Sequence, residues 1–232
     1  MNDFLNDFSS NFIERGAGFP LILLHGNGED ASYFSNQIDV FAERFHVFCL
    51  DTRGHGKSPR GDAPFTLSQF ADDLLAFMDA HGIQKAHILG FSDGGNIALL
   101  FALGYPERVE RLILNGANLR PSGVKLFVQA PIVFGWALTY LISRFDKKCL
   151  PHWELLNLMV TQPHIDASSL RALQAPTLVV AGTRDMIRAR HTRKIAESLP
   201  NARLVFLQGD HFVAAKSPEA FNQAVLSFLQ SK

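Results

Sequence analysis

The sequence contains few of the residues that stabilise small secreted or metal-bound proteins. Only two of its 232 residues are cysteine, Cys49 and Cys149, and they form neither a disulfide framework nor a metal-binding pair. Lysine plus arginine equals aspartate plus glutamate at 22 each, so no net charge favours nucleic acid or an anionic membrane as the partner. These absences favour a protein of a reducing compartment whose chemistry is local.

The sequence also lacks the pattern of a secretory signal and an uninterrupted membrane span. Residues 1–7 carry acids where a signal peptide carries lysines, and no apolar core follows them. The most apolar stretch, residues 126–142, is broken by Gln129, Pro131 and Gly135, whereas a transmembrane helix needs about 20 consecutive apolar residues. We therefore expect a cytoplasmic protein without a transmembrane segment.

The chain is rich in apolar runs that alternate with helical patterns. With 47% hydrophobic residues it is long enough for one large α/β domain over residues 1–232. Residues 12–16 predict an edge strand and turn. Continuous apolar runs predict buried strands, and the predicted strands are residues 19–24, 45–50, 87–91, 109–116, 176–185 and 203–212. The alternation stops over about residues 118–168. We predict a mostly parallel sheet with helices on both faces and a short helical lid inserted there.

A serine between glycines stands where one predicted strand meets a helix. The segment Gly90-Phe91-Ser92-Asp93-Gly94 predicts a sharp turn, because a strained serine there tolerates only the smallest neighbours two residues away. Such a turn exposes the Ser92 hydroxyl. It also puts the backbone N–H of Asp93 in the first turn of a helix, where the unpaired donors and the helix dipole favour a developing oxyanion. This arrangement is that of an acyl-transfer nucleophile.

An acid and a histidine end two later predicted strands. Asp185 ends the predicted strand at 176–185, and His211 lies at the end of the predicted strand at 203–212. Because the carboxyl ends of parallel strands share one edge of the sheet, we expect both near Ser92. His211 would then be the general base, with Asp185 fixing its tautomer. Asp166, in the irregular end of the predicted lid, is the weaker alternative for the acid.

The elbow Gly90-x-Ser92-x-Gly94 and the order Ser92, Asp185, His211 resemble the α/β-hydrolase family. The segment from Asp51 to Ser58, D-x-R-G-x-G-x-S, is also similar to that family's, where this loop is chiefly structural. The resemblance implies an α/β-hydrolase fold and a catalytic triad. It does not imply one reaction, because the same scaffold hosts esterases, lipases, C–C bond hydrolases and aminopeptidases.

The loop after the first buried strand reads His25-Gly26-Asn27-Gly28. In α/β-hydrolases this loop forms part of the oxyanion hole, so the resemblance implies the backbone N–H groups of Asn27 and Asp93 as the two donors. A second interpretation stays open here. Gly26-x-Gly28-x-x-Ala31 satisfies a loose dinucleotide fingerprint, with Asp51 at the end of the next strand as the ribose-binding acid, but it leaves the triad residues unexplained.

Asp93, directly after the serine, is the distinctive residue of the elbow. Gly-x-Ser-Asp-Gly-Gly resembles the valacyclovir hydrolase (biphenyl hydrolase-like) branch of the family, in which this acid recognises the α-amino group of the substrate. The other interpretation is that Asp93 stabilises the positive end of the following helix. The first would make the protein an amino-acid ester hydrolase or an aminopeptidase-like enzyme.

The predicted lid is rich in aromatic residues. They would offer an apolar wall suited to an acyl or aryl group, and the candidates for substrate contact are Phe127, Phe134, Trp136, Tyr140 and Trp153. The same surface also suits contact with a membrane surface, as in a monoacylglycerol-type lipase.

These observations lead to one expected function. We expect a serine hydrolase that cleaves small to medium carboxylic esters through an acyl-enzyme intermediate. No metal is expected, since the histidines show no metal-ligand spacing, and no cofactor is expected either. The expected partner is a small-molecule ester.

Overall fold

The chain folds around a seven-stranded sheet. In the computed structural model, which describes residues 10–231, the strand order is β1-β3-β2-β4-β5-β6-β7. Strand β1 pairs antiparallel with β3, and every other pairing is parallel. The strands are β1 (Phe12–Arg15), β2 (Pro20–Leu24), β3 (His46–Leu50), β4 (Ala86–Phe91), β5 (Val109–Asn115), β6 (Thr177–Gly182) and β7 (Ala202–Leu207). The mostly parallel sheet is as predicted.

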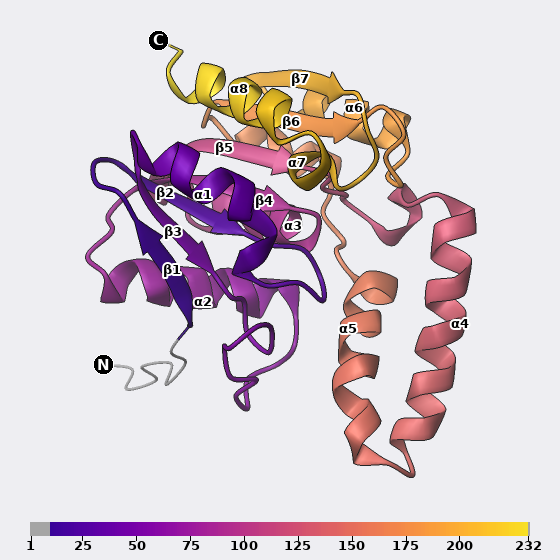
Figure 1. The fold of residues 1–232 in the computed structure, drawn as a ribbon. Coiled ribbons are helices and arrows are strands. Elements are labelled where there is room, and N and C mark those ends of the chain that lie inside the picture. The colour runs from indigo at the N-terminus through magenta and orange to yellow at the C-terminus, as the bar shows by residue number, and fades with distance from the viewer. Residues whose placement is uncertain (1–9, 232) are drawn as a thin grey trace.

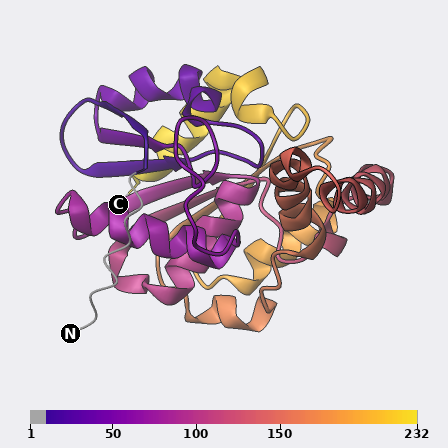
Figure 2. The same ribbon diagram turned by 90° about the horizontal axis from the view of Figure 1, so that it is seen from below.

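Helices cover both faces of this sheet (Figures 1 and 2). On one face lie α2 (Leu67–Ala80), α3 (Asp93–Gly104) and α6 (Ala189–Ser198), whose apolar side chains join one core cluster with the strands. On the other face α1 (Ser35–Ala42) and α8 (Pro218–Leu229) join a second cluster. Burying the strands on both sides explains their unbroken apolar runs.

Local signals in the sequence set where the helices begin and end. The Thr66 hydroxyl accepts a hydrogen bond from the Gln69 N–H at 3.2 Å and caps α2. Gly82 follows this helix with a φ of 65°, a conformation that glycine adopts without strain. Helix α7 (Val213–Lys216), a short turn directly after His211, was not predicted from the sequence.

The interruption predicted at residues 118–168 is a pair of helices. α4 (Leu126–Ser143) and α5 (Leu150–Thr161) pack along each other as a hairpin, beyond the end of the sheet to which the strand arrowheads point (Figure 1). By length and composition alone α4 could cross a membrane, but it contains Pro131 and packs against α5. The location in the cytoplasm stays a prediction.

Loop contacts fix the segment between β3 and α2. The Asp51 carboxylate accepts hydrogen bonds from the backbone N–H groups of Ala31 (2.8 Å) and Lys57 (2.9 Å). The Arg53 guanidinium forms a buried ion pair with Asp73 of α2, in which its Nε donates to the carboxylate at 2.7 Å. The D-x-R-G-x-G-x-S loop is thus held by its own acid and by α2, and Asp51 is occupied in a structural role that a ribose would have to displace.

Candidate active site

Ser92 occupies the strained turn that the flanking glycines predict. It has a φ of 52°, the only positive φ of a non-glycine residue in the described chain 10–231. A Cβ on Gly90 would lie 2.2 Å from the Gly94 carbonyl oxygen, and a Cβ on Gly94 would lie 2.1 Å from the Leu24 carbonyl oxygen. Both glycines are therefore required by backbone contacts, and the strain is held by β4 and β2.

Ser92, His211 and Asp185 form one chain of hydrogen bonds. The Oγ of Ser92 lies 3.0 Å from Nε2 of His211, and Nδ1 of His211 lies 2.7 Å from Oδ1 of Asp185. Asp185 and His211 are each only 3% exposed, so water does not compete for the hydrogen bond between them. The three side chains come from the carboxyl ends of β4, β6 and β7, as the strand order predicted.

The backbone around this chain fixes its acid and its base. The Asp185 carboxylate also accepts a hydrogen bond from the Ile187 N–H at 2.8 Å, which orients the carboxylate toward His211. Gly116, at the end of β5, lies beneath the imidazole, because a Cβ there would be 2.7 Å from Cε1 of His211. Asp166, the alternative acid, is exposed and caps a short 3-10 helix through the Ser168 N–H.

Two backbone N–H groups near the serine are candidates for an oxyanion hole. Asn27 follows β2, and Asp93 is the first residue of α3. Within residues 10–231 neither N–H donates a hydrogen bond to the protein. They are therefore available to a negatively charged oxygen, and the positive end of the α3 dipole adds to the second of them.

The Asp93 side chain is already held by two amides. Its Oδ2 accepts from the Asn27 side chain at 2.9 Å, and its Oδ1 accepts from the Asn96 side chain at 3.2 Å. Burial raises the pKa of Asp93, while the two amide donors and the coulombic attraction of His211 oppose that rise. The Asn27 side chain also donates to the Leu155 carbonyl of α5 at 2.9 Å, so it links the oxyanion loop to the hairpin.

The amide contacts of Asp93 continue through Asn96 to Asn118, and the sequence did not predict them. The Asn96 side chain donates to Oδ1 of Asn118 at 3.1 Å, and the Asn118 N–H donates back to Oδ1 of Asn96 at 2.9 Å. These asparagines join the start of α3 to the segment after β5. The only sequence signal is that polar residues occupy positions in otherwise apolar surroundings, which indicates burial with partners and not which partners.

Glu29 is hydrogen-bonded to Gly26 in the loop that carries the candidate oxyanion donor Asn27. Its Oε2 accepts a hydrogen bond from the Gly26 N–H at 3.1 Å, and its own N–H donates to the Gly26 carbonyl at 3.3 Å. Burial raises the pKa of Glu29 to about 7, against the opposing hydrogen bond from Gly26. Next to this loop Tyr33 stacks on Phe91 with ring centroids 4.2 Å apart, and Phe91 lies 4.8 Å from the His211 ring. Neither Glu29 nor Tyr33 was predicted as a site residue.

Glu29→Gln is expected to change how stability depends on pH. Between pH 4.5 and about 7 folded Glu29 keeps a proton that the unfolded chain releases, so the unfolding free energy of the wild type falls as pH rises through this range. Glutamine keeps the acceptor for Gly26 and does not titrate. A pKa raised from 4.5 to about 7 corresponds to at most about 3 kcal/mol, and partial exposure reduces the expected gain of the variant to about 1–2 kcal/mol.

Urea unfolding at pH 5 and pH 8 measures this effect. The difference in unfolding free energy between Glu29→Gln and wild type should grow in favour of the variant from pH 5 to pH 8. Glu43→Gln, on the exposed end of α1, is the matched control and should follow the wild-type curve. A Glu29→Gln difference that is the same at both pH values would contradict the assignment.

The aromatic residues predicted to contact substrate are not gathered into one wall. Phe127 and Phe134 on α4 are 75% and 72% exposed. Tyr140 and Trp153 contact each other across the hairpin, with ring centroids 5.7 Å apart, and the Trp136 Nε1–H donates to Asn157 of α5 at 3.0 Å. Trp136, Tyr140 and Trp153 thus hold α4 to α5. Substrate contact by any of the five aromatic residues stays a prediction.

His25, in the loop directly after β2, has a structural role. Nε2 of His25 accepts a hydrogen bond from the Thr52 N–H at 3.0 Å, and Nδ1 lies 2.7 Å from the Gly26 carbonyl. Burial lowers the pKa of His25 to about 4, so it stays neutral while it joins the ends of β2 and β3. Among residues 10–231 no three histidine, cysteine or acidic side chains come together as metal ligands.

The fold and the site together define a class: an open α/β protein with a serine on a strained strand-to-helix turn, hydrogen-bonded to a histidine and an acid at neighbouring strand ends. Comparison with known proteins agrees. The family model for the alpha/beta hydrolase fold matches residues 20–165. The chain therefore belongs to the α/β-hydrolase fold family, and we class it as a hydrolase.

Several known proteins are similar over nearly the whole chain. A Caulobacter protein (strain K31) named "Putative carbamate hydrolase RutD" is 31% identical over 243 residues, covering 91% of each chain. A hydrolase from Pseudomonas aeruginosa PA01 is 27% identical with a TM-score of 0.75, over 97% of this chain and 99% of its own. The enol-lactonase of Burkholderia xenovorans LB400 superposes with a TM-score of 0.82 at 23% identity, over 97% and 98% of the two chains.

Proposed function

We propose that the protein hydrolyses small to medium carboxylic esters through an acyl-enzyme on Ser92. The observation that carries the proposal is the continuous hydrogen-bonded chain from Ser92 through His211 to Asp185. A serine hydroxyl is a weak nucleophile unless a neighbouring base takes its proton, and His211 Nε2 is at the distance that this transfer requires.

The reaction follows from this geometry in two halves. His211 takes the Ser92 proton while Oγ attacks the ester carbonyl, and the N–H groups of Asn27 and Asp93 donate to the resulting oxyanion. His211 then gives its proton to the departing alcohol, which leaves an ester on Ser92. Water, deprotonated by the same imidazole, releases the acid and restores Ser92. Asp185 stabilises the imidazolium in both halves.

A carbamate is the second candidate substrate. The name of the Caulobacter relative supports it, since that protein is 31% identical over 91% of this chain. A carbamate carbonyl is attacked in the same way, but its nitrogen donates electron density and makes it less electrophilic. The proposed site could therefore cleave an ester or a carbamate. How well the site accommodates the nitrogen substituent of a carbamate would decide which of the two is preferred.

The role of Asp93 distinguishes two candidate functions, a general ester hydrolase and an amino-acid ester hydrolase. Both of its oxygens accept amide hydrogen bonds, and burial favours its neutral form. These contacts support Asp93 as the link between α3 and the oxyanion loop. Capture of a substrate ammonium would need the charged carboxylate to face the substrate. We accordingly expect the enzyme to show no preference for an α-amino group, and no contact among the described site residues favours a C–C bond hydrolase.

The test compares kcat/KM on three aryl substrates: an α-aminoacyl ester, its des-amino counterpart and the corresponding carbamate. Ser92→Ala is the blank. The proposal expects turnover of the des-amino ester well above the blank and no more than a few-fold gain from the amino group. A strong preference for the amino ester would assign Asp93 to substrate recognition. Turnover of the carbamate alone would mean that the substrate is a carbamate and not an ester. If none exceeds the blank, the acyl-enzyme proposal is wrong.

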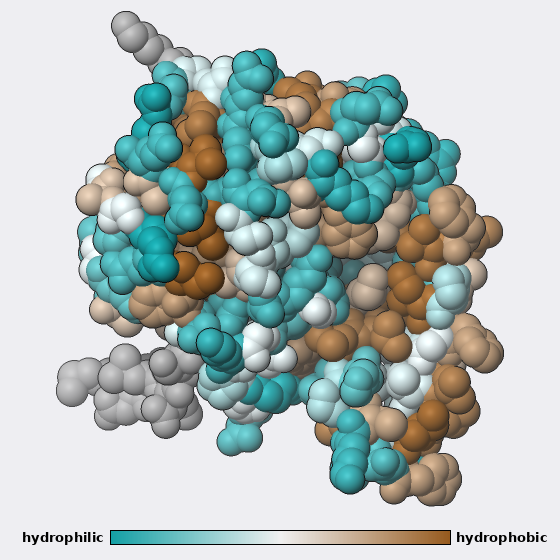
Figure 3. Space-filling model, in the orientation of Figure 1, coloured by the Kyte–Doolittle hydropathy of each residue, from teal (hydrophilic) through white to brown (hydrophobic). Residues whose placement is uncertain are grey.

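Activity at a lipid surface is supported by one further observation. Large apolar side chains of α4 and of the turn after it are exposed, and they include Leu126, Phe127, Phe134, Leu141 and Phe145. Figure 3 shows hydrophobic residues, in brown, over the hairpin. Aromatic and aliphatic side chains flanked by Lys125, Arg144, Lys147 and Lys148 suit an anionic interface. Vesicles added to the same assay distinguish this case, because only an interfacial enzyme is activated by them.

A further inference from the structure

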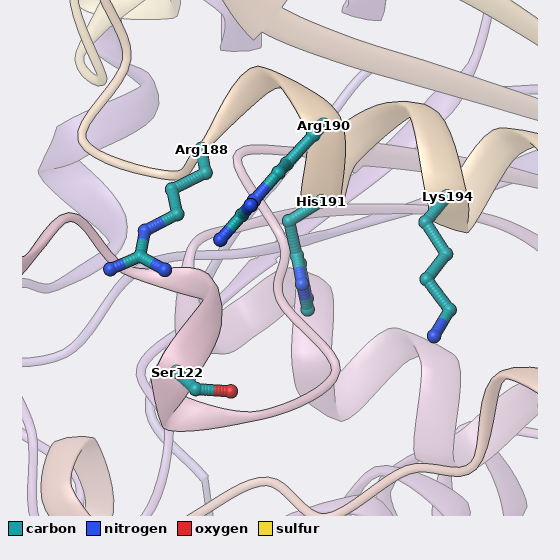
Figure 4. A pocket seen from close by; sticks show the side chains of 5 residues that line it. All are labelled: Ser122, Arg188, Arg190, His191 and Lys194. Carbon is teal, nitrogen blue, oxygen red and sulfur yellow. The ribbon is translucent and has the colours of Figure 1, made fainter.

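A group of cations lies at the beginning of α6, away from the triad. Figure 4 shows Arg188, Arg190, His191 and Lys194 directed from this element toward the loop that carries Ser122. These five residues line a cavity of about 350 Å³. An adjoining cavity of about 280 Å³ shares Ser122, His191 and Lys194 with it, and its further lining residues include Arg120 and Asp166. The two cavities thus form one polar groove between α6 and residues 119–123.

The cations of this groove have no partner in the described chain. Within residues 10–231 the side chains of Arg120, Arg188, Arg190 and Lys194 make no ion pair or hydrogen bond. Elsewhere on the surface some cations are paired, for example Lys85 with Glu110 at 2.6 Å and Arg108 with Asp79 at 2.8 Å. The groove has one acid, Asp166, whose carboxylate accepts a hydrogen bond from the Ser168 N–H at 3.1 Å. Positive charge is therefore in excess here although the whole chain is neutral.

The charges on α6 run in the order that is unfavourable for a helix. The N-terminus of a helix carries a partial positive charge, so acids stabilise the first turn and bases the last. α6 has Arg190 in its first turn and no acid there, while Glu197 is in its last turn. The helix dipole does not favour this arrangement of charges. A group of residues that breaks a local rule without a structural gain is a candidate for binding.

His191 holds the two sides of the groove together. Its Nε2 accepts a hydrogen bond from the Leu119 N–H at 2.9 Å, and its ring packs on Gly123, where a Cβ would lie 2.7 Å from Cδ2. Burial lowers the pKa of His191, and Lys194, Arg188, Arg120 and Arg190 lower it further. The neutral imidazole is thus held in place by Leu119 and Gly123. The positive charge of the groove comes from the arginines and the lysine around it.

We propose that this groove binds the phosphate group of a small phosphorylated ligand. Guanidinium groups bind phosphate through paired N–H donors, a lysine adds a compact charge, and the Ser122 hydroxyl supplies a neutral donor. Several cations around one cavity match a group with more than one negative charge better than a single carboxylate. The groove is a site separate from Ser92, and the proposal does not depend on the esterase reaction.

The bound anion would contact two segments: residues 185–188, which carry Asp185, and residues 120–124, which lead into α4 of the hairpin. The Arg188 N–H donates to the Gly123 carbonyl at 2.9 Å, and Ile187 pairs with Val124 as an isolated bridge. Asp185 lies three residues before Arg188, and α4 begins three residues after Gly123. Phosphate in the groove would therefore tie the base of the hairpin more firmly to the segment that carries Asp185.

Titration calorimetry with pyrophosphate and with inorganic phosphate tests the proposal on the full chain. We expect saturable binding at about 0.15 M salt, where weak surface attraction is largely screened. The double variant Arg190→Gln/Lys194→Gln should weaken binding at least tenfold, and Asp166→Asn should tighten it. Arg193→Gln is the matched control, because Arg193 lies on the same helix but stacks on the Phe206 ring at 5.1 Å. It should bind like the wild type.

Three results would overturn the proposal. They are no binding of either anion by the wild type, binding that disappears on raising the salt from low to physiological concentration, and an equal loss in Arg193→Gln and the double variant. Circular dichroism of each variant verifies the fold. Because calorimetry needs no turnover, the result is independent of whether the ester substrate is correct.

Discussion

Replacing Asp185 by asparagine is expected to lower kcat/KM on the preferred substrate by about 10⁴-fold with little change in side-chain volume. Asp185 lies 2.7 Å from Nδ1 of His211, and both are buried. When His211 takes the serine proton, the carboxylate compensates the new positive charge in a place that water does not reach. An amide there cannot supply that charge, and it permits the wrong imidazole tautomer.

The matched control for this prediction is Asp210→Asn. Asp210 is the neighbour of His211 in the sequence, but its carboxylate forms an ion pair with Lys216 at the surface. Its Oδ1 accepts from the Phe212 N–H at 3.0 Å, a contact that asparagine retains. Asp210→Asn should keep kcat/KM near the wild-type value. Equal losses in the two variants would mean that the loop around His211, and not the acid behind it, is what matters.

Gly94→Ala is expected to be the most destabilising single-methyl change in the elbow. The new Cβ would lie 2.1 Å from the Leu24 carbonyl oxygen and 2.5 Å from the His25 carbonyl oxygen, and neither backbone atom can move without displacing β2. Forcing α3 away from the sheet costs at least about 3 kcal/mol and would leave little folded protein. Whatever folds should also lose activity, because the Asp93 N–H moves with the helix.

Gly104→Ala controls for the added methyl group. Gly104 is the last residue of the same helix, and nothing lies within 4 Å of a Cβ built there. Alanine is the better helix former by up to about 1 kcal/mol, so this variant should be as stable as the wild type or more so. Thermal unfolding and soluble yield of the two variants give the comparison. A Gly94→Ala protein as stable as Gly104→Ala would contradict the packing of the elbow.

The sheet, its helices and the triad residues could be predicted because their signals are local. Unbroken apolar runs marked the parallel strands, and small residues on both sides of Ser92 marked a turn that only they permit. Asp185 and His211 could then be placed beside Ser92 because parallel strands end at one edge of the sheet. That reasoning needs the order of the elements and no side-chain detail.

Other features depend on contacts that the sequence pattern does not encode. α4 is apolar on nearly all sides, so periodicity could not indicate which aromatic residues pack on α5 and which remain exposed. The link from Asp93 through Asn27 to the Leu155 carbonyl joins residues that are 66 and 128 positions apart. The cationic groove likewise joins residues 120–122 to residues 188–194.

The measurement that tests the central claim most directly is trapping of the acyl group on Ser92. The protein is mixed with an activated aryl ester, quenched in acid during the first turnovers and digested with trypsin for mass spectrometry. The account predicts one acyl group on the peptide 86–108, in which Ser92 is the only serine, and none in Ser92→Ala. Turnover without an adduct on that peptide, or the same adduct in Ser92→Ala, would contradict it.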